Sequence, residues 1–333
     1  MAPSNPDPRA RRLLLVVDAP SLLHRNHHAR AHTGLRDRQG RPIWALQGML
    51  RQILESIDTM APDAIVFGLD DRTGSVRRDA YPDYKAGRAQ KDPELVDQLD
   101  RAGALLDALG LATVTPPGLE ADDVNASGAT WAERNGWNCV IITSDRDAFA
   151  HIGAHTRVLR LIDGGIHGSP MLNPARLFDM YAVRPDNYLA FAALRGDSSD
   201  NLPGVQGIGE KTAAILLDVA GSMDAAWADI DHNDGRALLE ALDDWSAETG
   251  GRRVGATVVR RLQADGARER YDFNVRMMSG RDDLDLGLTP DVPGSRGLLP
   301  LDLDRVTRVV GFLDNDFTTD FAVRVLTGRP ASG

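Results

Sequence analysis

The sequence predicts an α/β fold built around a parallel sheet, because short apolar runs that end at or near an aspartate alternate with stretches of helical periodicity. Strands joined by helical crossovers form parallel sheets that are buried on both faces. The apolar runs cover residues 13–17, 64–69 and 139–143, the helical stretches cover 45–57, 93–109 and 122–134, and a further strand is expected over 156–162.

The second half of the chain has a different pattern. Residues 174–276 have mostly helical periodicity, and residues 282–299 are rich in Gly and Pro, as loops are. A last strand or helix is expected near 306–313, and the proline-rich residues 1–10 are expected to form a frayed tail. These patterns predict an α/β core over 11–185, a helical subdomain over 186–281 and a C-terminal segment over 282–333 that packs back on the core.

The composition is that of an ordinary globular chain. Hydrophobic residues make up 42% and charged residues 26% of the 333 residues, which excludes collagen-like, coiled-coil and wholly disordered classes. The single cysteine, Cys139, excludes an internal disulfide and any multi-cysteine zinc or iron–sulfur site. No apolar run approaches the roughly 20 residues that cross a bilayer. We therefore expect a soluble cytoplasmic protein without a membrane partner.

The net charge of −10 would argue against a nucleic-acid ligand, but the charge is uneven along the chain. Residues 1–91 hold 15 Lys and Arg against 10 Asp and Glu, whereas the other 242 residues hold 23 against 38. The basic excess therefore lies early in the chain, but the number of arginines alone does not establish a nucleic-acid ligand.

Carboxylates follow successive predicted strands. Asp18 ends the first strand, Asp70 the second, and Asp145 closes the strand over 140–143. Because the carboxyl ends of parallel strands meet at one edge of a sheet, we expect these side chains to lie together. Further acids flank them in short motifs: Glu120, Asp122, Asp123, Asp147, Asp197 and Asp200.

Such a set of carboxylates predicts a metal centre. Nine of them at one edge would repel each other by several kcal/mol unless cations lay between them. Oxygen ligands without Cys or an obvious His set favour Mg²⁺ or Mn²⁺ over Zn²⁺. Two such ions about 4 Å apart serve phosphodiester hydrolysis. Any single acid has a structural alternative as a helix cap or turn residue, so the prediction rests on the set.

Residues 202–213 form a glycine-rich segment that differs from two better-known phosphate motifs. It is not a P-loop, because Glu210 precedes Lys211 and no strand comes before it, and it lacks the glycine order of a dinucleotide site. It is typical of a helix-hairpin-helix, in which backbone N–H groups meet DNA phosphates without reading sequence. A tight turn without a ligand is the alternative. The candidate DNA-binding residues are Gly204, Gly207, Gly209, Lys211 and Thr212.

A second candidate DNA-contacting segment mixes cations with aromatic residues, as single-strand binders do. It contains Arg77, Arg78, Tyr81, Tyr84, Lys85, Arg88 and Lys91. Its helical potential would place several of these residues on one broad face. A solvated charged surface is the alternative. His24, His28 and His32 are spaced four apart, which favours a polar helix face near bound phosphate over a metal site.

Taken together, the motifs resemble those of the 5′-nuclease family, the flap endonucleases and 5′–3′ exonucleases that include the N-terminal domain of bacterial DNA polymerase I. The family's order and spacing are matched by Val-Asp-Ala (17–19), Leu-Asp-Asp (69–71), Tyr-Lys-Ala-Gly-Arg (84–88), Gly-Leu-Glu-Ala-Asp-Asp (118–123), Ser-Asp-Arg-Asp (144–147) and the run from 196 to 213. The resemblance implies a PIN-like parallel sheet with flanking helices, a helical arch near 75–110 and a helix-hairpin-helix subdomain. His24, His27 and His28 stand where relatives carry aromatic residues, Val76 where they carry Phe and Arg78 where they carry His.

The resemblance also implies roles for single residues. The first metal would be surrounded by Asp18, Asp70, Glu120, Asp122 and Asp123, and the second formed or supported by Asp145, Asp147, Asp197 and Asp200. Arg25, Lys85 and Arg88 would contact the scissile phosphate region. A monovalent cation, often K⁺, would be bound by backbone carbonyls near Val205 and Ile208.

The expected activity is that of a Mg²⁺- or Mn²⁺-dependent 5′-nuclease. It would act as a monomer on flaps, pseudo-Y junctions, nicks or 5′ ends of DNA, RNA-primed DNA included, in primer removal and repair. Two alternatives stay open: a non-catalytic DNA-junction binder whose acids hold structural cations, and an RNase of the PIN type. The helix-hairpin-helix and the Tyr-Lys-Ala-Gly-Arg segment disfavour the RNase.

Overall fold

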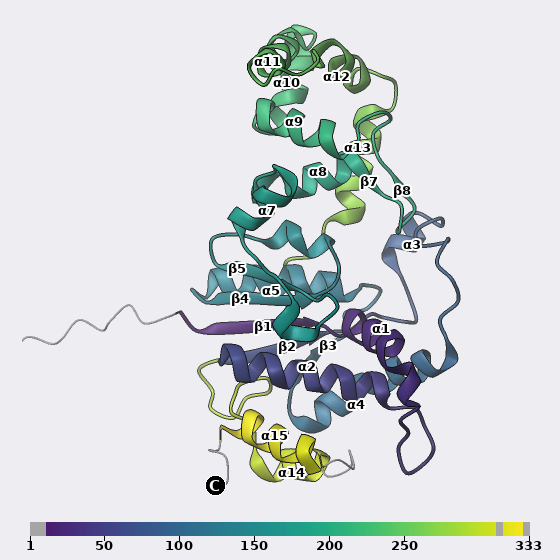
Figure 1. The fold of residues 1–333 in the computed structure, drawn as a ribbon, viewed down its shortest axis with the longest axis vertical. Coiled ribbons are helices and arrows are strands. Elements are labelled where there is room, and N and C mark those ends of the chain that lie inside the picture. Colours follow the sequence, from purple (N-terminus) through teal and green to yellow (C-terminus); the bar gives the residue numbers. More distant parts are fainter. Residues whose placement is uncertain (1–10, 311–315, 329–333) are drawn as a thin grey trace, which may run out of the picture. The chain divides into compact units, whose positions relative to one another are not determined.

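A computed structural model describes residues 11–310 and 316–328 of the chain, and its contacts divide the chain into two compact units (Figure 1). The first unit comprises Met1–Ser75, Gln90–Met171 and Gly280–Gly333, and the second comprises Val76–Ala89 and Leu172–Ser279. The tail expected over 1–10 and the end of the element expected over 306–313 lie outside the described residues. Across the described ranges, no helix is both long and apolar enough to cross a membrane.

The first unit contains the predicted sheet, whose strand order is β3-β2-β1-β4-β5-β6. Its strands are β1 (Leu13–Asp18), β2 (Ala64–Gly68), β3 (Ala112–Val114), β4 (Asn138–Thr143), β5 (Thr156–Arg160) and β6 (Met171–Leu172). β1 lies at the centre, where Val16 is paired in parallel with Val66 of β2 and with Ile141 of β4. All neighbouring pairs from β3 to β5 are parallel, so their carboxyl ends share one edge.

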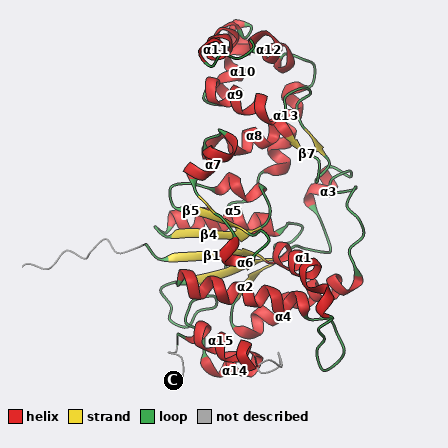
Figure 2. Ribbon diagram, viewed as in Figure 1, coloured by secondary structure: helices red, strands yellow, loops and turns green. Residues whose placement is uncertain are grey.

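Helices cover both faces of this sheet (Figure 2). The helices of the first unit are α1 (Ala19–Arg30), α2 (Trp44–Met60), α4 (Pro93–Leu109), α5 (Ala121–Arg134), α6 (Gly165–Gly168), α14 (Leu303–Val310) and α15 (Asp316–Thr327). Of these, α14 and α15 pack against α4 and α2. Because side chains alternate along a strand, Leu15 and Val17 join the core cluster of α1, α2 and α4, while Val16 faces α5. A Cβ at Gly128 of α5 would lie 2.5 Å from Val16, so this glycine allows the helix to approach closely.

The C-terminal stretch of the first unit returns to this core. Val306 of α14 and Leu326 of α15 are fully buried in the cluster that contains α2 and α4. Ahead of these helices, the Gly297 carbonyl accepts a hydrogen bond from the Ile65 amide of β2 at 2.8 Å. The loop expected over 282–299 therefore also extends the row of backbone bonds beside β2.

The second unit is helical, as residues 174–276 predicted. Its elements are α3 (Val76–Ala80), α7 (Pro174–Tyr181), α8 (Tyr188–Arg195), β7 (Gly196–Asp197), β8 (Leu202–Pro203), α9 (Glu210–Ala220), α10 (Met223–Asn233), α11 (Arg236–Glu248), α12 (Gly255–Leu262) and α13 (Ala267–Met278). It begins at Leu172, earlier than the boundary expected at residue 186, and it includes the separate stretch Val76–Ala89.

The helix expected through residues 77–88 is wrong beyond its first turn. α3 ends at Ala80, and the next residues form successive turns in which Lys85 has φ = +58°. Pro82 explains the end, because a proline inside a helix removes one backbone donor and clashes with the preceding turn. The turns carry Tyr84 into a buried cluster with Leu202 and Met277.

Candidate functional site

The carboxyl edge of the sheet in the first unit brings together acids from three strands. Asp18 ends β1, Asp70 lies just beyond β2, and Asp145 lies just beyond β4. Asp70 and Asp145 are close enough for their charges to act on Asp18. Asp70 Oδ1 also accepts a hydrogen bond from the Ala121 amide at 3.0 Å, which places the first turn of α5, with Glu120 before it, beside the same edge.

Asp18 is the most buried of these strand-end acids, with 5% of its surface exposed. Its Oδ1 accepts a hydrogen bond from the Ser21 amide at 2.9 Å, and its Oδ2 accepts one from the Thr143 hydroxyl at 2.7 Å. Burial nevertheless raises the pKa of Asp18 to about 7, and the negative charges of Asp70 and Asp145 act in the same direction. The two hydrogen bonds therefore do not fully offset the cost of burying the negative charge of Asp18.

Hydrogen bonds fix the loop that follows β4. The Asp145 amide donates to the Thr143 hydroxyl at 3.0 Å, and the Asp147 amide donates to Asp145 Oδ1 at 3.1 Å. The Ser144 amide donates to the Ser21 hydroxyl at 3.0 Å, which ties this loop to the start of α1. The backbone thus holds Asp18 and Asp145 in a fixed relation.

Asp123 differs from the other acids of this edge. It is fully buried, its Oδ2 accepts a hydrogen bond from the Glu120 amide at 2.9 Å, and its Oδ1 accepts one from the Arg281 amide at 2.9 Å. These bonds make Asp123 an anchor between α5 and the chain that returns from α13. Its part in metal binding stays a prediction from the resemblance.

The donor set fits a hard divalent cation. Asp18, Asp70 and Asp145 offer carboxylate oxygens, and none of the three forms an ion pair with a Lys or Arg in the described ranges. Within these same ranges, no group of three or more His, Cys, Asp and Glu side chains is already arranged to hold an ion. Asp18, Asp70 and Asp145 thus share one edge of the sheet without forming, among these described residues, a closed set of metal ligands.

In the second unit, Asp200 holds the two cations that the sequence assigns to phosphate contact. Lys85 Nζ lies 3.8 Å from Asp200 Oδ2, and Arg88 Nη2 donates to Asp200 Oδ1 at 2.5 Å. The backbone joins the same segments, since the Lys85 amide donates to the Asp200 carbonyl at 3.1 Å and Asn201 Nδ2 donates to the Asp83 carbonyl at 3.0 Å. The side chain predicted to support a metal is thus a counter-ion for Lys85 and Arg88 here.

Asp197 has local partners. Its Oδ1 accepts hydrogen bonds from both the Ser199 amide at 2.7 Å and the Ser199 hydroxyl at 2.6 Å. Burial works to raise the pKa of Asp197, but the bonds from Ser199 outweigh it and lower the pKa below its usual value. Asp197 is therefore held as an anion that orders the turn before Asp200.

The glycine-rich hairpin is shaped by close backbone approaches. A Cβ at Gly204 would lie 2.3 Å from the Arg195 carbonyl oxygen, so the antiparallel pair of β7 and β8 needs this glycine. Gly207 has φ = +78°, and its carbonyl accepts a hydrogen bond from Arg261 of α12. Gly209 is the N-cap of α9 and has open space around its Cα. Lys211 is exposed and Thr212 half-buried in the first turn of α9, whereas Val205 and Ile208 are buried.

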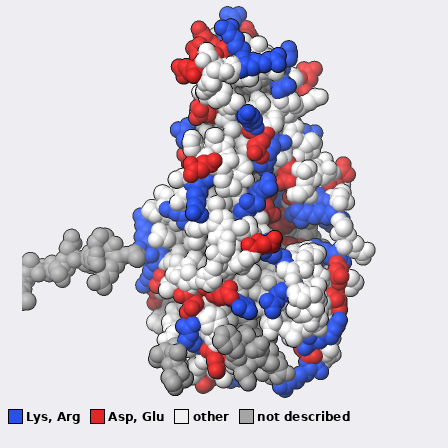
Figure 3. Space-filling view, viewed as in Figure 1, with Lys and Arg blue, Asp and Glu red and all other residues white. Residues whose placement is uncertain are grey.

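Two residues that hydrogen-bond to the hairpin region belong to none of the sequence motifs. Asn274 of α13 is fully buried, and its Nδ2 donates to the Ala193 carbonyl at 2.8 Å and to the Pro203 carbonyl at 2.9 Å. Arg261 lies with Arg260 in the last turn of α12, and Figure 3 shows basic side chains gathered in the part of the molecule that contains this helix. Arg261 follows Gly207 by 54 residues and Asn274 follows Pro203 by 71 residues, so only the tertiary structure relates them to the hairpin.

Three other predicted residues have partners within the protein. Arg25 Nη2 lies 2.5 Å from Asp163 Oδ1 at the surface of the first unit. Arg77 donates to the Met277 and Ser279 carbonyls, so it caps the end of α13. Tyr84 is 3% exposed, so it offers no open ring face for a DNA base and acts in packing.

An acid-rich edge on a parallel sheet, together with a helical unit that carries a glycine hairpin, defines the architecture of an α/β nuclease. Comparison with protein families makes this specific: residues 13–182 match the 5′–3′ exonuclease N-terminal resolvase-like domain, and residues 183–271 match the 5′–3′ exonuclease C-terminal SAM fold. The chain belongs to the 5′–3′ exonuclease family. This result confirms the fold class and the family that the motifs predicted.

Similar curated proteins are bacterial DNA polymerases. Thermostable DNA polymerase I of Thermus aquaticus is 39% identical over 225 residues, which is 68% of this chain and 26% of that protein. DNA polymerase I of Mycobacterium tuberculosis H37Rv is 33% identical over 315 residues, which is 94% of this chain and 31% of that protein. The chain thus spans about a third or less of the length of these relatives.

Solved structures confirm the fold. The T5 D15 protein co-crystallised with metal ions has a TM-score of 0.61 at 17% identity, over 95% of this chain and 98% of that one. The catalytic core of Rad2 in complex with a DNA substrate has a TM-score of 0.54 at 17% identity, over 95% of this chain and 92% of that one.

Proposed function

We propose that this chain is a divalent-metal-dependent 5′-nuclease that hydrolyses DNA phosphodiesters at 5′ flaps, pseudo-Y junctions, nicks and 5′ ends, as in primer removal and repair. The observation that carries the proposal is the uncompensated carboxylate edge of the first unit. Burial and like charges raise the pKa of Asp18 to about 7, which is the environment that a bound cation relieves. Family membership and relatives that bear metal ions or DNA support the same activity.

Asp18, Asp70 and Asp145 are the proposed ligands of this centre, with Glu120 and Asp122 beside them at the start of α5. Bound Mg²⁺ or Mn²⁺ would lower the pKa of water and stabilise charge on the phosphodiester oxygens. The chain's own contribution is orientation: the Ser21 amide and the Thr143 hydroxyl hold the two oxygens of Asp18 in place. Metal roles for Asp123, Asp147, Asp197 and Asp200 remain part of the proposal on the strength of the resemblance alone.

The second unit would supply the phosphate contacts. Lys85 and Arg88 carry the charge that neutralises a phosphodiester during cleavage, and Asp200 keeps both cations on one loop until DNA competes for them. At the hairpin, the open N-terminus of α9 with Gly209, Lys211 and Thr212 suits backbone phosphates. K⁺ at Val205 and Ile208, and a phosphate contact from Arg25, are proposed on the resemblance.

Cleavage of a labelled 5′-flap DNA tests the proposal. The wild type should release the flap in Mg²⁺ or Mn²⁺ but not in EDTA, and Asp122→Asn should lose this activity while remaining folded. Glu133→Gln is the matched control, because Glu133 is exposed at the far end of the same helix α5. Binding to junctions in Ca²⁺ without hydrolysis at any Mg²⁺ or Mn²⁺ concentration would instead establish the non-catalytic junction binder. Preferred cutting of RNA over DNA flaps would establish the RNase.

A further inference from the structure

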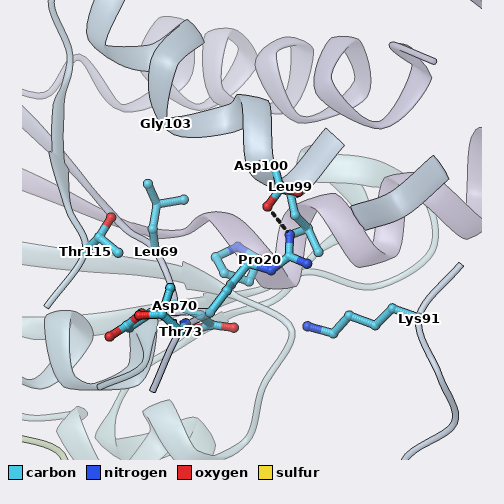
Figure 4. A pocket seen from close by; sticks show the side chains of 11 residues that line it. Pro20, Leu69, Asp70, Thr73, Lys91, Leu99, Asp100, Gly103 and Thr115 are labelled. Carbon is cyan, nitrogen blue, oxygen red and sulfur yellow. Dashed lines mark hydrogen bonds and ion pairs between the residues drawn. The ribbon is translucent and has the colours of Figure 1, made fainter. Parts of the chain in front are cut away.

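A cavity of about 290 Å³ lies in the first unit beside Asp70 (Figure 4). Leu69, Leu99 and Pro20 form its apolar part, and all three are largely buried. Lys91 stands at the other side, and its side chain points across the opening toward Asp70. The volume is at the low end for ligand sites, so the cavity suits one nucleotide-sized group.

The wall of this cavity is held in place without a ligand. Hydrogen bonds from the Thr73 hydroxyl, the Gly118 amide and the Thr73 amide lower the pKa of Asp71 to about 2. Arg72 forms an ion pair with Asp100 of α4. The loop after β2 is thus fixed at both ends, and a preformed site avoids the cost of ordering on binding.

A glycine of α4 keeps the cavity open. Gly103 lies in the interior of this helix, where Ala has the higher helix propensity. A Cβ at Gly103 would meet a single neighbour within 4 Å, Leu69 Cδ1 at 3.1 Å. A longer side chain there would extend into the cavity.

We propose that this cavity binds the nucleotide on the 5′ side of the bond to be cut, with its base on Leu69 and Leu99 and its phosphate toward Lys91. The inference rests on the proposed function, which places the reacting phosphodiester beside Asp70. An unpaired base leaves its stack at a lower cost than a paired one, and in a flap the unpaired nucleotides lie on the 5′ side. Aliphatic side chains contact the face of any base, so the site would be sequence-tolerant.

The ligand side of the test uses wild-type protein and flap substrates with one abasic position. An abasic residue at the first flap nucleotide should raise KM by about tenfold, because the contact between its base and the apolar wall of the cavity is lost. An abasic residue at the second flap nucleotide is the control and should change KM less than twofold. Equal KM values for all three substrates would overturn the proposal.

A second test changes the protein and keeps the substrates. It compares two variants, each with a leucine at one of two neighbouring positions of α4. Gly103→Leu should fill the cavity and abolish the tenfold difference in KM between intact and abasic flaps. Ala104→Leu adds the same side chain on the exposed face of α4 and should keep that difference. A thermal melt checks that Gly103→Leu is folded. If the folded variant keeps the difference in KM between intact and abasic flaps, the proposal is also overturned. If Gly103→Leu does not fold, the abasic series on wild type still decides.

A binding signal separates failure of the cavity from failure of the nuclease. With 2-aminopurine as the first flap base and Ca²⁺ as the cation, binding should unstack the base and raise its fluorescence severalfold in wild type and Ala104→Leu, but not in Gly103→Leu. A chain that binds in this way but cuts no flap would refute the nuclease and keep the cavity. A chain that cuts flaps without the fluorescence rise would refute the cavity alone.

Discussion

The acid edge of the first unit and the basic segment of the second unit differ in how their charged side chains are paired. Asp18, Asp70 and Asp145 are drawn together with neutral hydrogen-bond donors, and like charge raises the pKa of Asp18. Lys85 and Arg88 are instead held against a carboxylate, Asp200, whose side chain is almost fully buried. The acid edge therefore retains repulsion between like charges, whereas the charges of Lys85 and Arg88 are largely paired within the protein.

This difference indicates what each region needs from outside. A cluster of like charges gains free energy when an ion of opposite sign binds, so the acid edge is suited to a tightly held cation. A cation that is already paired gains less from a new partner, so in the proposed function DNA would have to compete with Asp200 for Lys85 and Arg88. Metal binding and DNA binding should therefore respond to different substitutions, and the following predictions test that separation.

The largest effect is expected at the acid edge. Asp70→Asn or Asp145→Asn should lower kcat on a flap substrate by about a hundredfold or more, because each removes charge from the proposed metal centre. DNA affinity in Ca²⁺, measured by fluorescence anisotropy, should change by less than about threefold. A large loss of affinity with unchanged kcat would show that the two regions are not separate in function.

A smaller effect is expected at Asp200. Asp200→Asn should lower kcat/KM by about tenfold, because Lys85 and Arg88 lose the partner that fixes them. In a chain that already carries Lys85→Ala and Arg88→Ala, the same substitution should have no further effect. If Asp200 acts as a metal ligand instead, its loss will persist in that background and will shrink as the Mn²⁺ concentration is raised.

Gly207 of the hairpin and Gly221, which caps the end of α9, form a matched pair of glycines. Gly207→Ala should weaken DNA binding about threefold to tenfold, because a Cβ there would lie 2.5 Å from Arg261 Nε and displace that side chain. Gly221→Ala imposes a similar backbone strain, since both residues have φ near +77°, but it has open space around it. Both variants should lose comparable stability in thermal melts, and only the first should lose DNA affinity in a salt titration.

The smallest effect is a pH dependence of stability. The pKa of Asp18 is higher in the folded chain, about 7, than its ordinary value of 3.8, so the folded state keeps a proton that the unfolded state releases between these values. The free energy of unfolding of the metal-free chain should therefore fall as pH rises from about 4 to about 7.

Thermal melts with and without Mn²⁺ check this prediction. Mn²⁺ binds the charged form, so it should reduce or reverse the fall in Tm over this pH range. Asp18→Asn should raise the metal-free Tm at pH 7.5 by a few degrees, and Glu133→Gln should leave it unchanged. If Asp18→Asn does not alter the pH dependence of Tm, another titratable group is responsible for it.

The acid edge could be predicted from the sequence because it follows from strand periodicity. Runs that end in Asp18, Asp70 and Asp145 place these residues at one edge as soon as the sheet is parallel. β3 and β6 escaped prediction because three and two residues are too short to show a period. Sequence periodicity therefore located the centre of the sheet better than its margins.

Residues 77–88 show why the second unit was harder to predict. Cations spaced for a helix suggested a helical face, but Pro82 ends the helix, and tertiary contacts of Tyr84 decide the turns that follow. Asp200 resembled a metal ligand in its motif, yet its partners come from more than a hundred residues earlier in the chain. Pairings over such distances leave no local trace in the sequence.

The hydrogen bond from Ile65 to Gly297 bears on the order of events during synthesis. A ribosome completes every helix of the second unit before it makes residue 297, and α14 and α15 come later still. The hydrophobic cluster around α2 and α4 therefore stays partly uncovered while the helical unit is already whole. A nascent chain would therefore complete its helical unit before its α/β core.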